Sequence, residues 1–307
     1  MTARVIVVGS INADVTATAS PLPRPGETLV GDSFDLVLGG KGSNQAVAAA
    51  RAEVETVMVG CVGADAFKEL TLGALGAEGI DLSLVETVGD RTGIAHIRVN
   101  GETGQNDIVI VPFANAELTP ERVERLLPPG GTDADADTVL LLQLEVPTAT
   151  TVRAAQLGRE RGWTVILDPA PALTLPEEIW AHVDVVKPNE TEAGIFSGVE
   201  VTDRASAEQA GRWFVERGVE HVIITRGAQG LLEVSADGAT EWEPRRVQAV
   251  DSTAAGDSFS GNLAAALAQG RPWEESVRRA RAAGTYAVTV AGASPSMPRP
   301  ADLEPYL

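Results

Sequence analysis

Cysteine is almost absent from the sequence, and long apolar stretches are absent too. Cys61 is the single cysteine among 307 residues, so no disulfide bond can form within the chain, and we expect a reducing cytoplasm as its location. Cys61 itself ends an apolar run, which predicts a place in the core. No apolar run approaches the roughly 18 residues that a membrane-spanning helix needs, and the N-terminal run is too short for a signal peptide. These features predict a soluble globular protein.

Basic residues are scarce. The sequence has 24 Lys and Arg against 43 Asp and Glu, a net charge of −19, and no basic cluster interrupts the acidic background. This balance argues against nucleic acid or an anionic membrane as a partner. An anionic ligand would need positive potential that is built locally, from helix N-termini, backbone amides or a bound cation.

Two familiar nucleotide-binding motifs are missing as well. The first predicted strand is followed by GSINAD and not by G-x-G-x-x-G, which leaves a dinucleotide-binding fold unsupported. The segment GGKGSN (39–44) resembles a P-loop, but Asp35 stands where the first glycine belongs, and Gly42 follows Lys41 where Ser or Thr is required. A protein of this sequence that handles phosphate must therefore use another device.

Short apolar runs alternate with helical patterns along the chain. The runs cover 4–8, 56–60, 138–142, 164–168, 183–186 and 221–225, and helical patterns cover 46–51, 66–77, 150–161 and 205–217, with Asn44 at the start of the first helix. This alternation indicates an α/β fold with a parallel-rich central sheet flanked by helices. We predict a single α/β domain over residues 1–307, with an exposed acidic loop at 128–137.

Two regions depart from this alternation. Segments of about 12–39 and 91–112 show strand-like alternation with glycine-bearing turns and little helical signal. They predict a second, smaller sheet that projects from the first and acts as a lid that excludes water. The alternative is an edge extension or a dimer surface, and these roles can coexist with a lid.

Polar or small residues follow five of the predicted strands directly. They form the segments GSINAD, QLE, DPAPA, KPNETE and RGAQG. Ligands of open parallel sheets bind outside the carboxyl ends of the strands, so we expect a binding site at this edge of the sheet.

The segment DSTAAGDSFSGN (251–262) places small residues and aspartates where a helix begins. Apolar residues at Phe259, Leu263 and Leu267 indicate one helix face, so the N–H groups of 254–257 have no partner inside the helix. Such amides can bind an anion, and small side chains let it come close. Asp257 can be either a helix cap or a base that accepts the proton of a hydroxyl group.

Eight short motifs, in this order, resemble the ribokinase-like family of carbohydrate kinases. They are GSINAD (9–14), GGKGSNQAVAAAR (39–51), LLQLEVP (141–147), DPAPA (168–172), KPNETEA (187–193), ITRGAQG (224–230), VQAVDSTAAGDSFSG (247–261) and GASPSMP (292–298). The resemblance runs from Val5 to about Pro298. It implies a ribokinase-like fold with a β-sheet lid that also forms a homodimer interface. It also implies transfer of the γ-phosphate of ATP to the 5-hydroxyl of ribose, with Mg²⁺ and K⁺.

The resemblance also assigns roles to residues. Asp257 corresponds to the general base, and the amides of Ala254, Ala255 and Gly256 correspond to the anion hole for the transferring phosphoryl group. The sugar contacts correspond to Asn12, Asp14, Gly40, Lys41, Asn44 and Glu145, with Asp257 at the 5-hydroxyl. The nucleotide contacts correspond to Asn189, Thr225, Arg226, Gly227, Gly230, Ala255, Gly256 and Arg281.

Two ion sites are implied in the same way. Asn189 and Glu192 fit the family motif N-x-x-E, which is tied to Mg²⁺ through water, and they can also form the cap and first turn of a helix. The oxygens of a monovalent-cation site, mostly backbone carbonyls that suit K⁺, correspond to Asp251, Thr253, Ala287, Val290, Gly292 and Ser296. For Asp251 and Thr253 the alternative is an ordinary Asx turn.

Three positions depart from the family pattern, and other functions stay open. Phe113 stands where the family usually has Gly and could narrow the sugar pocket, Arg281 replaces a more usual Asn or His, and Val290 replaces a frequent Arg. The alternatives are a kinase of 2-deoxyribose, fructose or a nucleoside, and a non-catalytic sugar-binding homologue. Aromatic residues make up only 4% of the chain, which argues against binding a second base, and the retained Asp257 argues against a non-catalytic protein.

Overall fold

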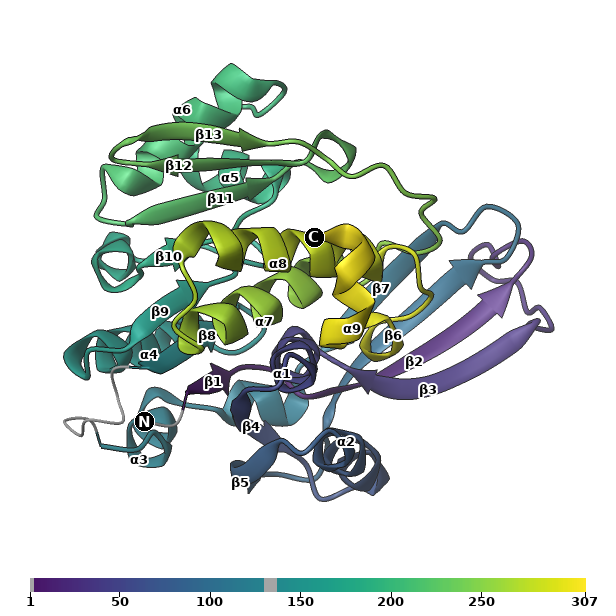
Figure 1. The fold of residues 1–307 in the computed structure, drawn as a ribbon. Coiled ribbons are helices and arrows are strands. Elements are labelled where there is room, and N and C mark those ends of the chain that lie inside the picture. Colours follow the sequence, from purple (N-terminus) through teal and green to yellow (C-terminus); the bar gives the residue numbers. More distant parts are fainter. Residues whose placement is uncertain (1–2, 130–136) are drawn as a thin grey trace.

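Two sheets organise the chain in the computed structural model, which describes residues 3–129 and 137–307 (Figure 1). Within these residues the larger sheet has nine strands, in the order β13-β12-β11-β10-β9-β8-β1-β4-β5. Their bounds are β1 (Arg4–Val8), β4 (Glu55–Val62), β5 (Asp81–Thr87), β8 (Thr138–Leu142), β9 (Thr164–Leu167), β10 (Val185–Val186), β11 (His221–Thr225), β12 (Leu231–Ser235) and β13 (Gly238–Trp242). Most of the predicted acidic loop at 128–137 lies outside the described residues.

The pairing in the larger sheet is parallel except at one edge. Strands β12 and β13 pair antiparallel with their neighbours, and the other neighbouring strands run parallel. The sequence patterns indicated the strands that are apolar throughout. They did not single out β5, β12 and β13, which carry more polar residues; β5 and β13 are the edge strands, and β12 lies next to β13.

Helices cover both faces of the larger sheet. Their bounds are α1 (Lys41–Arg51), α2 (Ala66–Ala77), α3 (Pro120–Leu126), α4 (Thr148–Glu160), α5 (Glu190–Ser197), α6 (Arg204–Val215), α7 (Ala255–Ala268), α8 (Trp273–Ala287) and α9 (Pro300–Leu303). In β1, Val5 and Val7 pack in the core that contains α1, α7 and α8, whereas Ile6 and Val8 pack in the core that contains α3, α4 and α6. Successive strand residues point to opposite faces, so burial on both faces requires an apolar strand throughout. The predicted α/β fold is confirmed.

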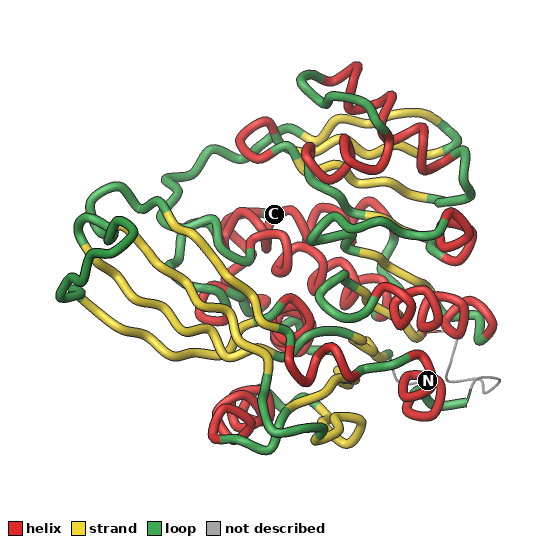
Figure 2. Tube along the Cα trace, turned by 180° about the vertical axis from the view of Figure 1, so that it is seen from behind, coloured by secondary structure: helices red, strands yellow, loops and turns green. Residues whose placement is uncertain are grey.

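A second sheet projects from the side of the first, as Figures 1 and 2 show from opposite directions. Its strands lie in the order β3-β2-β6-β7. Their bounds are β2 (Asn12–Ala19), β3 (Ser33–Gly39), β6 (Gly93–Asn100) and β7 (Asn106–Val111). The predicted smaller sheet from these two regions is therefore confirmed. Large apolar side chains on it stay exposed, among them Phe34 at 64% and Val109 at 60%.

Helix α1 begins earlier than the sequence pattern predicted. It begins at Lys41, so Asn44 lies in the first turn and not at the helix start. Two features extend the helix: Gly40 adopts φ 90°, which a residue with a side chain rarely adopts, and the Lys41 N–H donates to Glu145 Oε2 at 2.9 Å. Glu145 lies 104 positions from Lys41 in the sequence, so a local sequence pattern could not predict this hydrogen bond.

Helices α1 and α7 approach each other closely at Gly261. A Cβ atom at this position would lie 2.5 Å from the Cβ of Ala48 and 2.6 Å from the backbone oxygen of Gln45. A glycine is therefore needed for the two helices to cross at this distance. The crossing brings the first turn of α7, with Asp257, next to the first turns of α1.

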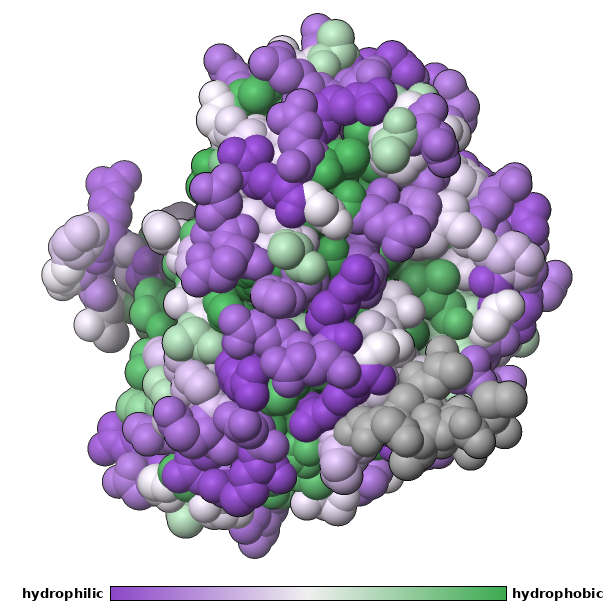
Figure 3. All heavy atoms as spheres, turned by 90° about the vertical axis from the view of Figure 1, so that its left-hand side faces the viewer, coloured by the Kyte–Doolittle hydropathy of each residue, from purple (hydrophilic) through white to green (hydrophobic). Residues whose placement is uncertain are grey.

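Cys61 and the surface of the molecule can be compared with what the composition predicts. Cys61 is a free, buried cysteine in the core, as predicted. None of the helices in the described residues is both long and apolar enough to cross a membrane. Figure 3 shows that hydrophilic residues cover most of the face on the left of Figure 1, with small apolar patches between them.

Candidate active site

A cleft of about 1050 Å³ lies where the carboxyl ends of the central strands meet the start of α7. The cleft lies at the edge of the sheet where the sequence predicted a binding site. The predicted site residues that line it are Lys41, Asn189, Glu192, Thr225, Gly227, Gly230, Ala254, Ala255, Gly256, Asp257 and Arg281. Two residues without a predicted role, Asp168 and Lys187, also line it.

Asp257 lies in the first turn of α7 and is only 4% exposed. Its Oδ1 accepts a hydrogen bond from Gln45 Nε2 at 2.9 Å, and its Oδ2 accepts one from Asn44 Nδ2 at 3.3 Å. The helix is preceded by Ala254, which offers no side-chain cap. Asp257 therefore accepts hydrogen bonds from side-chain amides and not from the backbone N–H groups of α7, so it does not act as the cap of this helix. Burial raises the pKa of Asp257, against the opposing charge of Lys41.

The start of α7 has no side-chain cap and follows a sharp turn of the backbone. Ala254 has φ 58°, which turns the chain sharply before the helix. The Ala255 N–H donates to the backbone oxygen of Ser252 at 3.3 Å. Since no side chain caps this helix, the N–H groups of Gly256 and Asp257 are available to a ligand in the cleft. The predicted anion-hole residues therefore come together with Asp257 at one end of the cleft.

A buried ion pair supports this turn. Lys187 Nζ lies 3.1 Å from Asp168 Oδ2 and donates to the backbone oxygen of Gly256 at 3.2 Å. Both side chains are almost fully buried. Both residues belong to motifs of the sequence, DPAPA (168–172) and KPNETEA (187–193), but neither was predicted to have a role. The available signal was their position directly after the buried strands β9 and β10.

The predicted sugar residues gather next to Asp257, from β2, α1 and the segment after β8. Glu145 Oε2 accepts from Ser10 Oγ at 2.6 Å as well as from the Lys41 N–H, which fixes this carboxylate. Asn12 Oδ1 accepts from Asn115 Nδ2 at 2.7 Å. Asn115 was not predicted, and it orients Asn12 so that the amide nitrogen of Asn12 is left to donate elsewhere.

Two ionisable groups in this region have shifted pKa values. Burial, together with the negative charges of Glu145 and Asp257, raises the pKa of Asp14 to about 7. The charge of Asp257 raises the pKa of Lys41 above its ordinary value, so Lys41 carries a positive charge. A protein that is acidic overall thus places a positive charge beside Asp257 and the predicted anion hole.

Phe113 lies just after β7, on the way to Asn115. Its φ is 41°, a conformation that glycine adopts more readily, which agrees with the glycine usual in the family. The guanidinium of Arg91 lies 5.4 Å from the centre of the Phe113 ring. The effect of Phe113 on the pocket stays a prediction.

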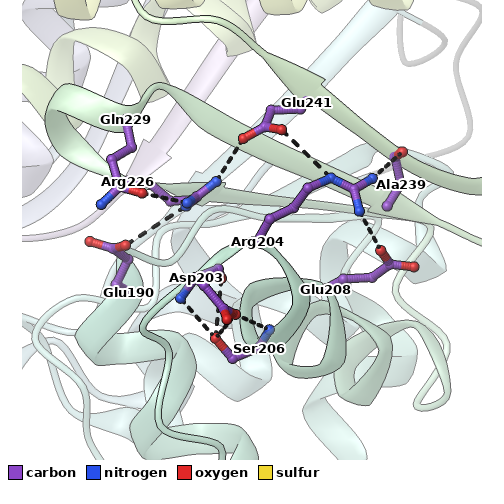
Figure 4. Close-up of polar contacts among 9 residues, drawn as sticks. All are labelled: Glu190, Asp203, Arg204, Ser206, Glu208, Arg226, Gln229, Ala239 and Glu241. Carbon is purple, nitrogen blue, oxygen red and sulfur yellow. Dashed lines mark hydrogen bonds and ion pairs between the residues drawn. The ribbon is translucent and has the colours of Figure 1, made fainter.

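Arg281 and Arg226, which both have a predicted nucleotide contact, differ in where their side chains point. Arg281 lines the cleft and donates from Nη1 to the backbone oxygen of Glu243 at 3.0 Å. Arg226 instead directs its guanidinium to Glu241 Oε1 at 2.9 Å and towards Glu190 and Gln229, as Figure 4 shows. We therefore expect the backbone of the loop after β11, and not the Arg226 side chain, to meet a nucleotide.

Asn189 and Glu192 form the predicted helix cap. Asn189 Oδ1 accepts from the Glu192 N–H at 2.8 Å, and Glu192 Oε2 accepts from the Asn189 N–H at 2.9 Å. Both residues also line the cleft. Burial raises the pKa of Glu192. In the described ranges no group of three or more His, Cys, Asp or Glu is placed to hold a metal ion.

The two predicted cation segments lie side by side. Asp251 Oδ1 accepts from the Thr253 N–H at 2.9 Å, which is the Asx turn of the alternative. Asp251 Oδ2 reaches across to accept from the Gly292 N–H at 2.9 Å. Burial would raise the pKa of Asp251, but these hydrogen bonds hold it below its ordinary value. The turn and the contact between segments therefore coexist, and a carboxylate with neighbouring carbonyls is a donor set that fits a monovalent cation.

A buried carboxylate beside uncapped helix amides, in a cleft at the carboxyl edge of a parallel sheet, is an arrangement for moving an anionic group. Residues 2–300 match the pfkB family of carbohydrate kinases, and the chain belongs to this family. It is 40% identical over 294 residues to the ribokinase of Haemophilus influenzae, covering 95% of this chain and 94% of that protein.

Two further relatives inform the choice of substrate. The chain is 34% identical over 305 residues to the deoxyribokinase of Salmonella typhi, covering 99% of this chain and 98% of that protein. It superposes with a TM-score of 0.87 on the structure of Arabidopsis thaliana ribokinase complexed with ribose and ATP, at 32% identity, covering 99% of this chain and 98% of that one.

Proposed function

We propose that this carbohydrate kinase transfers the γ-phosphoryl group of ATP to the 5-hydroxyl of D-ribose. The observation that carries the proposal is Asp257, buried at the start of α7 between the uncapped helix amides and the predicted sugar residues. Identity of 40% to a ribokinase supports ribose as the sugar.

The chemistry follows from these positions. Phosphoryl transfer depends mainly on positioning and on stabilising negative charge. Asp257 accepts the proton of the attacking hydroxyl, while the amides of Ala254–Asp257 stabilise the transferring oxygens. Mg²⁺, when bound with ATP, neutralises phosphate charge, and Asn189 and Glu192 would hold it through water. Closing the second sheet over the sugar would exclude water from the reaction.

A panel of sugars with ATP tests the proposal. Ribose, 2-deoxyribose, fructose and a nucleoside are each incubated with Mg-ATP, and the phosphate ester and its position are identified. We expect ribose 5-phosphate as the main product. A different sugar as the best substrate would replace ribose in the proposal, and no ester from any sugar would favour the non-catalytic alternative.

Asn12 is expected to discriminate against 2-deoxyribose. Asn115 occupies Asn12 Oδ1, so the Asn12 amide nitrogen is left to bond the 2-hydroxyl. Leaving this buried group unpaired costs about 1–3 kcal/mol, or about 5- to 150-fold in kcat/KM. We expect wild type to prefer ribose by this factor and Asn12→Ala to lose the preference, whereas the exposed Asn106→Ala keeps it. A wild-type enzyme with no preference for ribose contradicts this role and favours the deoxyribokinase alternative.

We further propose that a monovalent cation, most simply K⁺, binds beside the anion hole. Its oxygen ligands are those of Asp251, Thr253, Ala287, Val290, Gly292 and Ser296. The hydrogen bond between Asp251 and Gly292 supports the proposal because it brings the two segments together. In this position the site would hold the turn that leads into α7.

The prediction is that initial rates, at fixed Mg-ATP and ribose, are higher in K⁺ or Cs⁺ than in tetramethylammonium. Asp251→Ala should abolish the activation, and the exposed Asp237→Ala should retain it. Equal rates in Na⁺, K⁺, Cs⁺ and tetramethylammonium would refute the cation site.

We propose that the enzyme is a homodimer through the second sheet and that it works in the cytoplasm. The support for the dimer is a group of exposed apolar residues on one face of this sheet, Val37, Ile108 and Ile110, because such a surface is usually covered by a partner. Sedimentation velocity should give the mass of two chains. A mass of one chain at micromolar concentration would contradict the dimer. The cytoplasmic location rests on the single cysteine.

A further inference from the structure

We propose that Gln45, oriented by Gln143, is a positioning residue that holds Oδ1 of Asp257 and leaves Oδ2 to take the proton of the sugar hydroxyl. The inference rests on the proposed function, because it concerns the base of that reaction. It adds two residues to the site that have no other assigned role.

Gln45 joins two buried carboxylates. It lies in the first half of α1 and is fully buried. Its Nε2 donates to Asp257 Oδ1 at 2.9 Å and to Asp168 Oδ2 at 2.9 Å. The side-chain amide nitrogen of glutamine has two N–H donors. Both donors of Gln45 are therefore used, one on each carboxyl group. Hydrogen bonds of this kind are among the stronger ones in proteins.

Gln143 fixes which way the Gln45 amide faces. Gln143 lies directly after β8, and its Nε2 donates to Gln45 Oε1 at 2.6 Å. A Cβ atom at Gly9 would lie 2.0 Å from Gln143 Oε1, so Gln143 itself packs tightly against the backbone of Gly9. With Gln45 Oε1 occupied in this way, Gln45 Nε2 must face the two carboxylates.

The two oxygens of Asp257 therefore have different surroundings. Oδ1 is held by Gln45, deep between α1 and α7, whereas Oδ2 faces Asn44, one of the predicted sugar residues. The 5-hydroxyl would approach from the sugar side. Its O–H bond breaks, the proton moves to Oδ2, the oxygen forms a bond to the γ-phosphorus, and the bond from that phosphorus to the β–γ bridging oxygen breaks, releasing ADP.

Charged groups from four other segments also act on Asp257. They are Lys41 on α1, Lys187 after β10, Asp168 after β9 and Asp14 on β2. The lysines favour the ionised carboxylate and the aspartates favour the protonated one. The Gln45 hydrogen bond favours the ionised form and so lowers the pKa of Asp257, against the burial that raises it. Loss of that bond should leave the base protonated over a wider pH range.

The test uses two variants and a matched control. Gln45→Met removes the donor, and Gln143→Glu keeps the size of the side chain but, when ionised, offers only acceptors. In the second variant, Gln45 would turn its nitrogen towards the introduced carboxylate and its oxygen towards Asp257. The control is Gln269→Met, near the end of α7, where Gln269 Nε2 donates to the backbone oxygen of Ala52 at 2.9 Å.

We expect the acidic limb of the kcat–pH profile to move upwards by about one to two pH units in both variants, since a hydrogen bond to a charged group is lost. KM for ribose should change far less, because Oδ2 and Asn44 are retained. The control should match wild type. ¹³C NMR of the aspartate carboxyl carbons, with the Asp257 signal assigned by its loss in Asp257→Asn, should show the same upward shift without turnover.

Two results overturn the inference: folded variants whose acidic limb and Asp257 signal titrate as in wild type, or variants in which KM rises while the profile stays in place. Failure of the proposed function is a different outcome. If wild type makes no sugar phosphate, the NMR titration still measures whether Gln45 controls Asp257.

Discussion

Replacing Asp257 with Asn is expected to lower kcat by roughly 10²–10⁴-fold, the usual contribution of a general base. Asn keeps the size of the side chain and can still accept from Gln45 or Asn44, but it cannot take the proton of the hydroxyl. The affinity for the sugar should therefore change far less than kcat. Steady-state kinetics with ribose and Mg-ATP, together with calorimetric titration of ribose, measure the two quantities.

A matched control separates this effect from a general loss of an aspartate. Asp237 is exposed in the turn between β12 and β13, and Asp237→Asn should leave kcat unchanged. Near-normal turnover of a folded Asp257→Asn protein would remove Asp257 from the role of base.

Removal of the buried Lys187 is expected to have the largest effect on stability. In Lys187→Met the carboxylate of Asp168 stays buried without its charged partner at 3.1 Å, although Gln45 still donates a hydrogen bond to it. Breaking one side of a buried ion pair in this way typically lowers the free energy of unfolding by about 3–5 kcal/mol. The variant also loses the hydrogen bond to the Gly256 oxygen, so kcat should fall because the anion hole is less well held. Urea denaturation and steady-state kinetics measure both effects.

The double variant Asp168→Asn with Lys187→Met provides the internal comparison. It removes both charges, and much of the lost stability should return even though the anion hole stays unsupported. Lys68→Met, at a half-exposed position on α2, is the control for the loss of a lysine. A Lys187→Met protein as stable and as active as wild type would show that the pair neither stabilises the fold nor supports the site.

Much of the fold could be predicted because its signals are local. Strands such as β1 and β8 are apolar throughout, since helices cover both faces of the sheet, and this composition is visible in the sequence. The start of α7 was visible for the same reason: small residues precede an apolar helical pattern. Strand β10 is shorter than its apolar run. Strands β5, β12 and β13 were missed because they carry more polar residues than the central strands.

The chemical groups of the predicted site and its local shape are visible in the amino-acid sequence: a carboxylate at Asp257, and small residues at the start of a helix. Which of these groups meet depends on the packing of distant segments. Gln45 and Asp257 are 212 positions apart, and they touch because Gly261 lets α7 cross α1 closely. Asn115 likewise reaches Asn12 across 103 positions. Periodicity and caps act within a few residues, whereas these contacts depend on how whole helices and strands pack.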